Sequence, residues 1–491
     1  MTYVGYVSES CTPLEASAPA CGFAAKPRAA EQGPALLEAV GASTSVPLAN
    51  GTWATYANLD LAASAPALRA VADRVNTTLQ WYASVHRGAG YLSQVSTSLY
   101  EAARLSLGAF VGARPDDEVL ITRNTTDSIN LLARSVPGRI LVLDIEHHAN
   151  LLPWQAAAGG ATVLNALPTQ AATIAALEDE LAVGDYALLA VTGASNVTGE
   201  ILPLAQVAEI AHSHGARLFV DAAQLAPHRP IDIAATGVDY VALSGHKLYA
   251  PYGAGALIGR IDWLDDAEPY LRGGGAVTNV TTRGAEWQRG VARHEAGSPN
   301  VIGAVALATA AETLQAVGFA ALQAHEAALV GRLHQGLATI PGVRVARIWE
   351  DSADRVAVVT FALAGLEPGF VAAYLSAEHG IGVRDGRFCA HPLLRKLGLD
   401  QGAVRASVGA STTGEHVERL IAAVRWLATG QPIREYEVRD GAWTLRHDTR
   451  PIPSGLHLDH LIDTAAAGCT PAVAPAVAPA AGCTPATEPA S

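Results

Sequence analysis

The chain has 491 residues, of which 50% are hydrophobic and 16% are charged, and its formal net charge is −13. This acidity and the lack of a basic block argue against a nucleic-acid-binding protein. No apolar run approaches the ~18 residues that a membrane helix needs, and the first residues lack the basic and apolar regions of a secretory signal. We therefore expect a cytoplasmic globular protein that binds neither nucleic acid nor a membrane.

Composition and periodicity divide the chain into five regions. The first, residues 1–45, is predicted to be an irregular extension with one short helix near Pro34–Leu37. Only Cys389 of the five cysteines lies in the globular body, which argues against a disulfide scaffold. The other regions are a large α/β domain (46–300), a small α+β domain (301–430), a polar extension (431–463) and a disordered Ala/Pro-rich tail (464–491).

A short apolar strand, Glu118–Thr122, leads into Thr125 and Thr126, whose surroundings have the composition of a helix start. The free N–H groups of a helix N-terminus, with hydroxyls beside them, form a natural phosphate site. Capping of the helix by either threonine is the plainer interpretation, and the two roles are compatible. The sequence therefore predicts a candidate phosphate site at these two threonines.

Next, Arg139–Glu146 has the continuous apolar pattern of a strand inside a parallel sheet, and it ends in His147 and His148. Adjacent histidines can bind a metal, but no Cys or His spacing elsewhere supports a zinc site. An imidazole ring that stacks on a flat cofactor is an equally good use of His147. We expect no metal site.

Strands and helices continue to alternate along the chain, which predicts an α/β fold with a largely parallel sheet. Asn196 follows the strand Tyr186–Thr192, and Gln224 follows the strand Arg217–Asp221. Asp221 itself ends an apolar strand, so we expect it to be buried, and a buried carboxylate needs a partner.

The apolar strand Tyr240–Ser244 ends abruptly before His246 and Lys247. A lysine in this place is either a solvated loop residue or an activated amine, and lysine amines form Schiff bases with carbonyl cofactors, most commonly pyridoxal 5'-phosphate (PLP). Functional groups of α/β sheets collect at the carboxyl ends of the strands, so one crevice would hold Lys247 together with Asp221 and His147.

A PLP enzyme needs four kinds of contact, and this chain offers all four. They are an amine for the aldehyde, a carboxylate for the pyridine nitrogen, a flat group over the ring, and hydroxyls with helix N–H groups for the phosphate. The residues that supply them are Lys247, Asp221, His147 and the Thr125–Thr126 helix start with Ser244 and His246. The sequence therefore predicts PLP as cofactor.

After about residue 300 the pattern changes. It predicts helices at Ile302–Gln315, Ala320–Ala338 and Gly369–His379, a strand at Arg405–Val408, and an amphipathic helix that opens at Thr413. Helices and strands in this order predict a separate α+β domain.

From about residue 56 to 427 the chain resembles the class V aminotransferases, and among them most closely the group II (SufS-type) cysteine desulfurases and selenocysteine lyases. The resemblance implies fold type I of the PLP enzymes, with a seven-stranded, mostly parallel sheet and a smaller C-terminal domain to which the N-terminal segment contributes. The matching motifs are Asp60 with Ala62–Ser64, Val85–Gly88, Thr125–Thr126, Glu146–Asn150 with Pro153–Trp154, Ser195–Val197, Asp221–Gln224, Ser244–Tyr249, Glu295–Asn300, Arg384 with Gly386 and Cys389–Ala390, and Arg405–Ser407.

The resemblance also implies a role for each cofactor residue. Lys247 would bind the aldehyde of PLP and later move the Cα proton of the substrate. Asp221 would pair with the pyridine nitrogen, and His147 would stack on the ring. The remaining contacts would be Asn196 and Gln224 at the ring hydroxyl, and Thr125, Thr126, Ser244 and His246 at the phosphate.

On the substrate side, the resemblance implies that Arg405 holds the carboxylate, for which a guanidinium is well suited. Further substrate contacts would be Arg384, His86 and Asn196. Cys389 would attack the sulfur of cysteine (or the selenium of selenocysteine), leaving alanine and a persulfide. The positive charges of Arg384 and Arg387 are expected to favour its thiolate.

Three positions depart from the family pattern, and all lie on the substrate side. Phe388 stands where the family usually has His before the Cys, Gly193 stands where a His precedes Ser-Asn, and Ser411–Thr412 replace an aromatic–Asn pair. Two alternatives therefore stay open. One is another class V enzyme (aminotransferase, epimerase or β-lyase) in which Cys389 is a buried, inert residue. The other is a binding or scaffold protein on the same fold.

The family further implies partners. Fold type I PLP enzymes generally work as dimers, so we expect a homodimer that acts on a small amino acid. A persulfide on Cys389 would be passed to a sulfur-acceptor protein.

Overall fold

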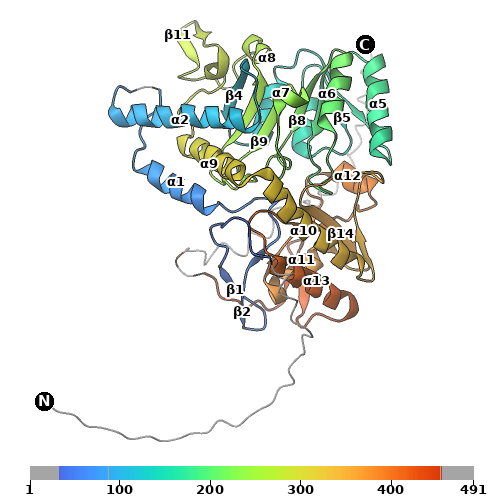
Figure 1. Cartoon of the computed structure of the whole chain (residues 1–491). Coiled ribbons are helices and arrows are strands. Elements are labelled where there is room, and N and C mark those ends of the chain that lie inside the picture. The colour runs from blue at the N-terminus through green and yellow to red at the C-terminus, as the bar shows by residue number, and fades with distance from the viewer. Residues whose placement is uncertain (1–32, 87, 454, 456–491) are drawn as a thin grey trace, which may run out of the picture.

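The computed structural model describes residues 33–86, 88–453 and 455. Its larger domain is built on a seven-stranded sheet in the order β4-β10-β9-β8-β7-β5-β6 (Figure 1). Only β10 runs antiparallel to its neighbours, so the predicted mostly parallel sheet is confirmed. The strands are β4 (Asp117–Thr122), β5 (Arg139–Leu143), β6 (Ala161–Leu164), β7 (Tyr186–Thr192), β8 (Arg217–Asp221), β9 (Tyr240–Ser244) and β10 (Gly255–Arg260).

Both faces of this sheet are covered, as parallel sheets require. Along β5, Leu141 and Leu143 belong to one apolar cluster, whereas Ile140 and Val142 belong to a cluster on the other face. The large-domain helices are α1 (Arg69–Leu79), α2 (Tyr91–Phe110), α3 (Thr125–Ala133), α4 (Leu152–Gln155), α5 (Gln170–Val183), α6 (Leu204–Ser213), α7 (Ile233–Thr236), α8 (Asp262–Asp266) and α9 (Val301–Val317). A hairpin of β11 (Val277–Thr281) and β12 (Gly284–Trp287) extends from this domain.

The small domain is the predicted α+β unit. Its antiparallel sheet has the order β13-β14-β17-β16. These strands are β13 (Val343–Val345), β14 (Val358–Leu363), β16 (Arg384–Gly386) and β17 (Ala403–Ser407). The helices are α10 (Phe319–Ala338), α11 (Pro368–His379), α12 (His391–Lys396) and α13 (Gly414–Thr429), and the hairpin of β18 (Tyr436–Arg439) and β19 (Ala442–Leu445) packs on α11.

The N-terminal segment lies beside the small domain rather than the large one (Figure 1). After β1 (Ser45–Pro47) and β2 (Trp53–Thr55), the strand β3 (Ala57–Asn58) pairs in parallel with β15 (Ile381–Gly382). The short helix predicted near Pro34–Leu37 is wrong, because the amides of Leu36 and Leu37 both donate to the carbonyl of Ala410, at 2.8 and 2.9 Å. The predicted tail, residues 464–491, lies outside the described residues, and the domain bounds stay a prediction.

A sharp bend joins the two domains. α9 packs on α1 and α2, Gly318 follows it with a positive φ of 87°, and α10 leaves at 84° into the small domain (Figure 1). Within the described ranges, no single helix is long and apolar enough to cross a membrane, and only this bent pair meets that length and composition together. Most residues of α9 are buried in the protein, which is the usual origin of such a pattern.

Candidate active site

The predicted site residues meet in one cavity of about 380 Å³, at the carboxyl ends of β7, β8 and β9. The large domain supplies most of its wall, and the small domain closes it through β16, β17 and the segment between them. The polar residues that line it are Asn124, Thr125, Thr126, His147, Thr192, Asn196, Asp221, Gln224, Ser244, His246, Lys247, Arg384, Cys389 and Arg405. A topological crevice of this kind is the usual ligand site of an α/β sheet.

Lys247 and Asp221 form the charged centre of the cavity. Burial lowers the pKa of Lys247 to about 8, although the Asp221 carboxylate opposes this shift. Burial also raises the pKa of Asp221, while Lys247 and a hydrogen bond from the Ala223 amide (3.0 Å) lower it. A lysine with this pKa has a substantial neutral fraction near pH 7–8, and the neutral amine is the form that attacks a carbonyl.

His147 supplies a flat, uncharged ring. Burial lowers its pKa to about 3, and the charges of Lys247 and His148 contribute to the same shift. Its Nδ1 accepts a hydrogen bond from the amide of Ala149 at 3.0 Å, which orients the imidazole. A neutral ring is the form that can lie against a planar cofactor without adding charge.

The start of α3 is arranged to accept an anion. Asn124, and not Thr125 or Thr126, caps the helix, because its Oδ1 accepts the Asp127 amide at 2.9 Å. The two threonine hydroxyls are therefore not consumed by capping. Thr125 is buried and Thr126 is exposed, and both line the cavity at the positive end of the helix.

Unpartnered polar atoms test whether the cavity fits PLP. In the described part of the chain, six buried side-chain polar atoms lack a hydrogen-bond partner. Three of them, Thr125 Oγ1, Gln224 Oε1 and Arg405 Nε, belong to residues of this one cavity. Buried groups of this kind are normally paired, so their clustering indicates a polar ligand. The residues fit the phosphate, ring and carboxylate ends of PLP with an amino acid.

Arg405 is held on β17 with most of its surface buried. Its Nη1 donates to the carbonyl of Asn196 at 2.9 Å, and its Nη2 donates to Asp60 Oδ1 at 3.2 Å. Burial lowers the pKa of this guanidinium, whereas Asp60 raises it. Asp60 is the acidic partner that the sequence left without a role.

Cys389 is exposed at the rim of the cavity, which argues against the buried, inert alternative. It and Phe388 both have left-handed backbones, with φ of 53° and 50°. Two bonds from the large domain hold this segment: Asn196 Nδ2 donates to the Phe388 carbonyl, and the His148 amide donates to the Cys389 carbonyl, each at 2.8 Å. The segment thus presents the thiol to the cavity through contacts between the domains.

Two of the three departures from the family pattern, Phe388 and Gly193, are closely packed in the structure. Phe388 is buried and its ring lies 5.2 Å from the Arg405 guanidinium carbon, a cation–π arrangement. At Gly193, an added Cβ would meet Leu225 and Val220 at 2.9 and 3.0 Å. No side chain fits there without a shift of these neighbours.

His86 is the one predicted site residue outside the cavity. Its Nε2 lies 2.9 Å from Glu101 Oε1, and its ring packs edge-on against Tyr100 at the corner of α1 and α2. Its substrate role stays a prediction. Among the described residues, no group of three or more His, Cys, Asp or Glu side chains is placed to hold a metal ion.

One buried carboxyl behind the cavity was not predicted. Glu146 is fully buried, accepts hydrogen bonds from Asn150 Nδ2 (2.6 Å) and the Thr192 amide (3.0 Å), and has its pKa raised by burial to about 8. Trp154 Nε1 in turn donates a hydrogen bond to Asn150 Oδ1 at 2.8 Å. The sequence signal that could have indicated this buried carboxyl is a Glu, followed by polar residues, close after an apolar strand.

Comparison with known proteins decides the family. The family model described as "Aminotransferase class-V" matches residues 57–420. The chain belongs to the class-V aminotransferase family. This confirms the resemblance, and the cofactor-side motifs all fall inside the matched range.

Several curated relatives of this chain are named cysteine desulfurases. A "Probable cysteine desulfurase" from Mycolicibacterium paratuberculosis is 37% identical over 357 residues, which are 71% of this chain and 51% of that protein. A "Cysteine desulfurase" from Dickeya dadantii is 37% identical over 392 residues, which are 76% of this chain and 92% of that protein. The chain spans only 51–60% of the length of three longer curated relatives.

Solved structures show the same class-V fold. The apo structure of a cysteine desulfurase from Thermococcus onnurineus NA1 is 32% identical, has a TM-score of 0.71, and covers 79% of this chain and 97% of that one. The arrangement of the two domains described above is thus that of fold-type I PLP enzymes.

Proposed function

We propose that this class-V enzyme is a PLP-dependent cysteine desulfurase that converts L-cysteine to alanine and leaves the sulfur on Cys389. The observation that carries the proposal is an exposed thiol on the rim of the cavity that also holds Lys247 and Arg405. The names of the relatives, at about 36% identity, support it.

The cofactor would be held by residues already in place. Thr125, Thr126, Ser244 and His246, which line the cavity, would hold the phosphate, His147 would offer its ring face, and Asp221 would provide the carboxylate for the pyridine nitrogen. PLP, when bound to an amino group, draws electrons away from the substrate Cα. Lys247, with its pKa near 8, is the group suited to bind the aldehyde and to take up the Cα proton.

Arg405 and Cys389 would act on different parts of the substrate, its carboxylate and its sulfur. The guanidinium holds the carboxylate of cysteine, and Asp60 keeps it in place beforehand. The Cys389 thiolate then forms an S–S bond with the substrate sulfur as the Cβ–S bond breaks. The electron pair of the broken bond stays on the carbon skeleton, which takes up a proton and leaves as alanine. Cys389 retains the sulfur as a persulfide, which we expect to be passed to an acceptor protein.

The deciding experiment is the Cys389→Ala variant, incubated with L-cysteine and a reducing thiol. We expect sulfide release to fall by at least about two orders of magnitude, since the nucleophile of the covalent step is gone. PLP absorbance should be unchanged, because the cofactor residues are untouched. Undiminished sulfide release would instead favour a class-V enzyme in which Cys389 is incidental. Assays of keto acid and alanine would then separate an aminotransferase from a β-lyase.

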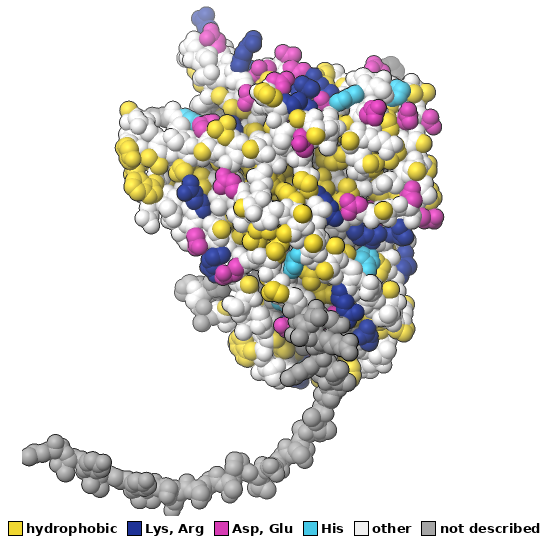
Figure 2. Space-filling view, viewed as in Figure 1, with side chains coloured by type: hydrophobic (Ala, Val, Ile, Leu, Met, Phe, Trp, Pro, Cys, Tyr) yellow, Lys and Arg dark blue, Asp and Glu magenta, His cyan; other side chains and the backbone are white. Residues whose placement is uncertain are grey.

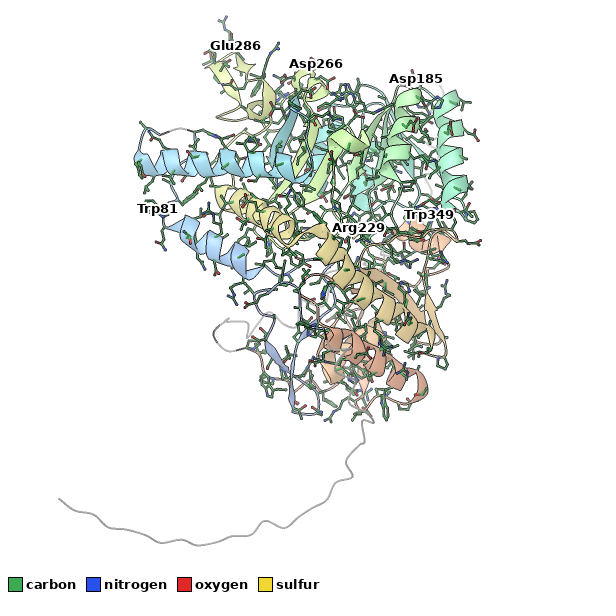
Figure 3. All side chains as sticks on the ribbon, in the orientation of Figure 1. Trp81, Asp185, Arg229, Asp266, Glu286 and Trp349 are labelled. Carbon is green, nitrogen blue, oxygen red and sulfur yellow. The ribbon has the colours of Figure 1, made fainter. Side chains whose placement is uncertain are left out.

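We also propose that the enzyme is a homodimer that uses the corner between α1 and α2. Five large apolar side chains are exposed there; Figure 3 labels Trp81 at this corner, at the left edge of the molecule, and Figure 2 shows hydrophobic side chains gathered at the same edge. They are Leu79 (54%), Trp81 (47%), Tyr82 (48%), Tyr91 (70%) and Leu92 (39%). An apolar patch of this kind is typical of an interface, and His86 lies beside it.

The test of the dimer is the molar mass in solution by light scattering. Tyr91→Asp should shift the protein toward the monomer, because the charge would be buried in the interface. Val183→Asp is the matched control, since Val183 is 84% exposed on α5, away from this corner. A monomeric wild-type protein, or equal masses for all three, would refute the interface.

A further inference from the structure

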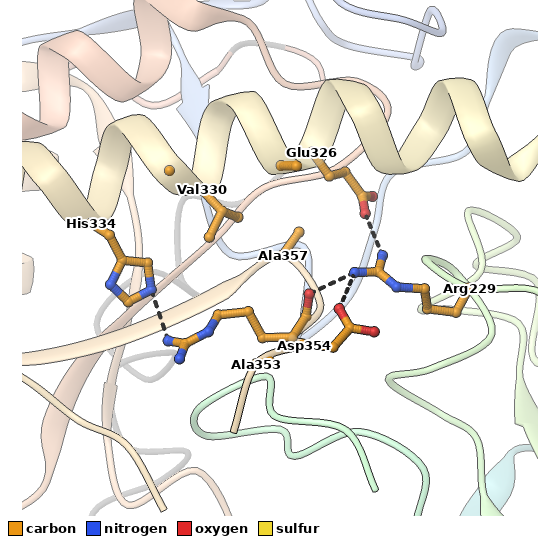
Figure 4. A pocket seen from close by; sticks show the side chains of 10 residues that line it. Arg229, Glu326, Val330, His334, Ala353, Asp354 and Ala357 are labelled. Carbon is orange, nitrogen blue, oxygen red and sulfur yellow. Dashed lines mark hydrogen bonds and ion pairs between the residues drawn. The ribbon is translucent and has the colours of Figure 1, made fainter. Parts of the chain in front are cut away.

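A second cavity, of about 450 Å³, lies between α10 and the segment that leads into β14 (Figure 4). It shares no lining residue with the candidate active site. Arg229 enters from the large domain, and the rest comes from the small domain. The residues that carry the argument are Arg229, Glu326, Val330, His334, Arg355 and Ala357.

One end of this cavity is electrically compensated. Arg229 Nη2 donates to Asp354 Oδ1 at 3.0 Å and to the Arg355 carbonyl at 2.7 Å. Its Nη1 lies 3.8 Å from Glu326 Oε2, and Glu326 Oε1 lies 2.7 Å from His228 Nδ1. Two carboxylates therefore surround this guanidinium, and the end near Glu326 would repel an anion.

At the other end of the cavity, Arg355 is a cation that no carboxylate of the described residues contacts. Arg355 Nη1 donates to His334 Nε2 at 3.1 Å, as the dashed line in Figure 4 shows. The charge of Arg347 also acts on this histidine; Arg347 donates hydrogen bonds to the carbonyls of Trp349 and Glu350, and its charge also lowers the pKa of the exposed Asp351 carboxylate. Among the described residues, neither Arg355 nor Arg347 has a carboxylate within 4.0 Å. The guanidinium of Arg355, which lines the cavity, thus contacts an imidazole and, within the described part of the chain, no carboxylate.

Between the two ends, the wall is apolar. Ala327 and Val330 face the cavity from α10, and Ala357 faces it from the opposite side. These side chains have no hydrogen-bonding group, so a second polar or charged substituent on a ligand would be unpaired there.

We propose that this second cavity binds a small aliphatic monocarboxylate, with its carboxylate on Arg355 and His334 and its short apolar body against Val330 and Ala357. A guanidinium matches the two oxygens of a carboxylate in a fork, which favours this anion. Asp354 and Glu326 at the far end exclude a ligand with a second negative charge.

Binding at this site is linked to proton uptake. Burial lowers the pKa of His334 to about 4, and Arg355 and Arg347 add to the shift. A carboxylate beside the ring offsets those two charges, so the pKa of His334 rises when the ligand binds. The other charged groups of the cavity, Arg229, Glu326 and Asp354, interact with one another at the opposite end, and the Asp351 carboxylate near Arg347 is exposed to solvent, so the charges that act most on His334 are those of Arg355 and Arg347. Affinity therefore increases as the pH falls.

The test is titration calorimetry of the full-length protein with PLP bound, using butyrate as the probe. The Arg355-dependent part of binding should be roughly fivefold tighter at about pH 5.5 than at about pH 7.5. Arg355→Gln should weaken it by roughly tenfold or more, the usual effect of losing a charge-assisted bond. His334→Gln should retain binding at the higher pH and lose the pH dependence. Any butyrate held by Arg405 contributes equally in all these proteins.

The matched control is Arg344→Gln. Arg344 is an exposed arginine of β13 that donates to the carbonyls of Leu397 and Gly398 and does not line the cavity. The Arg344→Gln variant should bind butyrate with an affinity within about twofold of that of the wild type. Equal affinity of wild type and Arg355→Gln, or no pH dependence in wild type, would overturn the proposal. Tighter binding of inorganic phosphate than of butyrate would overturn the assignment to monocarboxylates.

Discussion

The two walls of the candidate active site are built in different ways. On the large-domain wall, Asp221 and Ser244 directly end regular strands of a sheet that is buried on both faces, and Lys247 follows in a short turn. On the small-domain wall, Phe388 and Cys389 occupy consecutive left-handed conformations, each of which costs about 1–2 kcal/mol for a residue with a Cβ. The large-domain wall, here called the cofactor wall, is held by its own sheet. The small-domain wall with Cys389, here called the sulfur wall, is held by contacts across the domains.

The contrast is sharpest at Lys247, where we expect the largest effect. Lys247→Ala should reduce sulfide release by at least about three orders of magnitude and abolish the visible absorbance that added PLP acquires on the protein. Lys396→Ala is the matched control, because Lys396 pairs with Asp144 at 2.5 Å on the surface side and does not line the cavity. The sequence has one further lysine, Lys26. PLP absorbance that persists in Lys247→Ala would contradict the assignment of the cofactor wall.

The pH dependence of the rate of PLP binding tests the pKa of Lys247 on the cofactor wall and is expected to show a smaller effect. Only the neutral amine reacts, and burial lowers the pKa of Lys247 to about 8. The initial rate for the ligand-free protein should therefore rise about tenfold per pH unit below pH 8 and level off above it. Asp221→Asn should move the midpoint to lower pH, because the carboxylate stabilises the ammonium form. A midpoint near pH 10 would show that the lysine is solvated.

The smallest expected effect concerns the strain of the sulfur wall. Cys389→Gly and Cys389→Ala both remove the thiol, so neither should release sulfide. Glycine adopts the φ of 53° without penalty, so Cys389→Gly should be more stable than Cys389→Ala by about 1 kcal/mol. Denaturant unfolding of the two proteins measures this difference. If alanine were the more stable residue, the segment would not be strained in solution.

The sequence predicts the cofactor wall well because each of its residues follows a recognisable strand. Asp221 ends β8 and Lys247 follows β9, so the apolar runs place both residues at the carboxyl edge of the sheet, while their cofactor roles rest on the family resemblance. Three small-domain helices are predicted nearly to the residue at their starts, for example Ala320–Ala338 against the observed Phe319–Ala338, whereas the short helix α12 was not predicted.

What the sequence misses depends on weak local signals or on distant pairing. α2 is absent from the predicted elements, since Gly90 gives it no side-chain cap and no acidic residue occupies its first turn. The exposed hairpin β11–β12 has no buried face to produce an alternating pattern. The pair of Asp60 and Arg405 joins residues 345 positions apart, which no local pattern can reveal. The left-handed backbone of Phe388 and Cys389 is set by tertiary contacts alone.

The parallel pairing of β3 with β15 also bears on how the protein is made. Residues 57–58 leave the ribosome long before residues 381–382, and the whole seven-stranded sheet is synthesised between them. The small domain cannot fold until its last strands have left the ribosome. Its first strand, β3, therefore stays unpaired while the larger domain folds. A nascent chain stopped near residue 340 should therefore hold a folded large domain with an unprotected N-terminal segment, open to proteolysis until synthesis is complete.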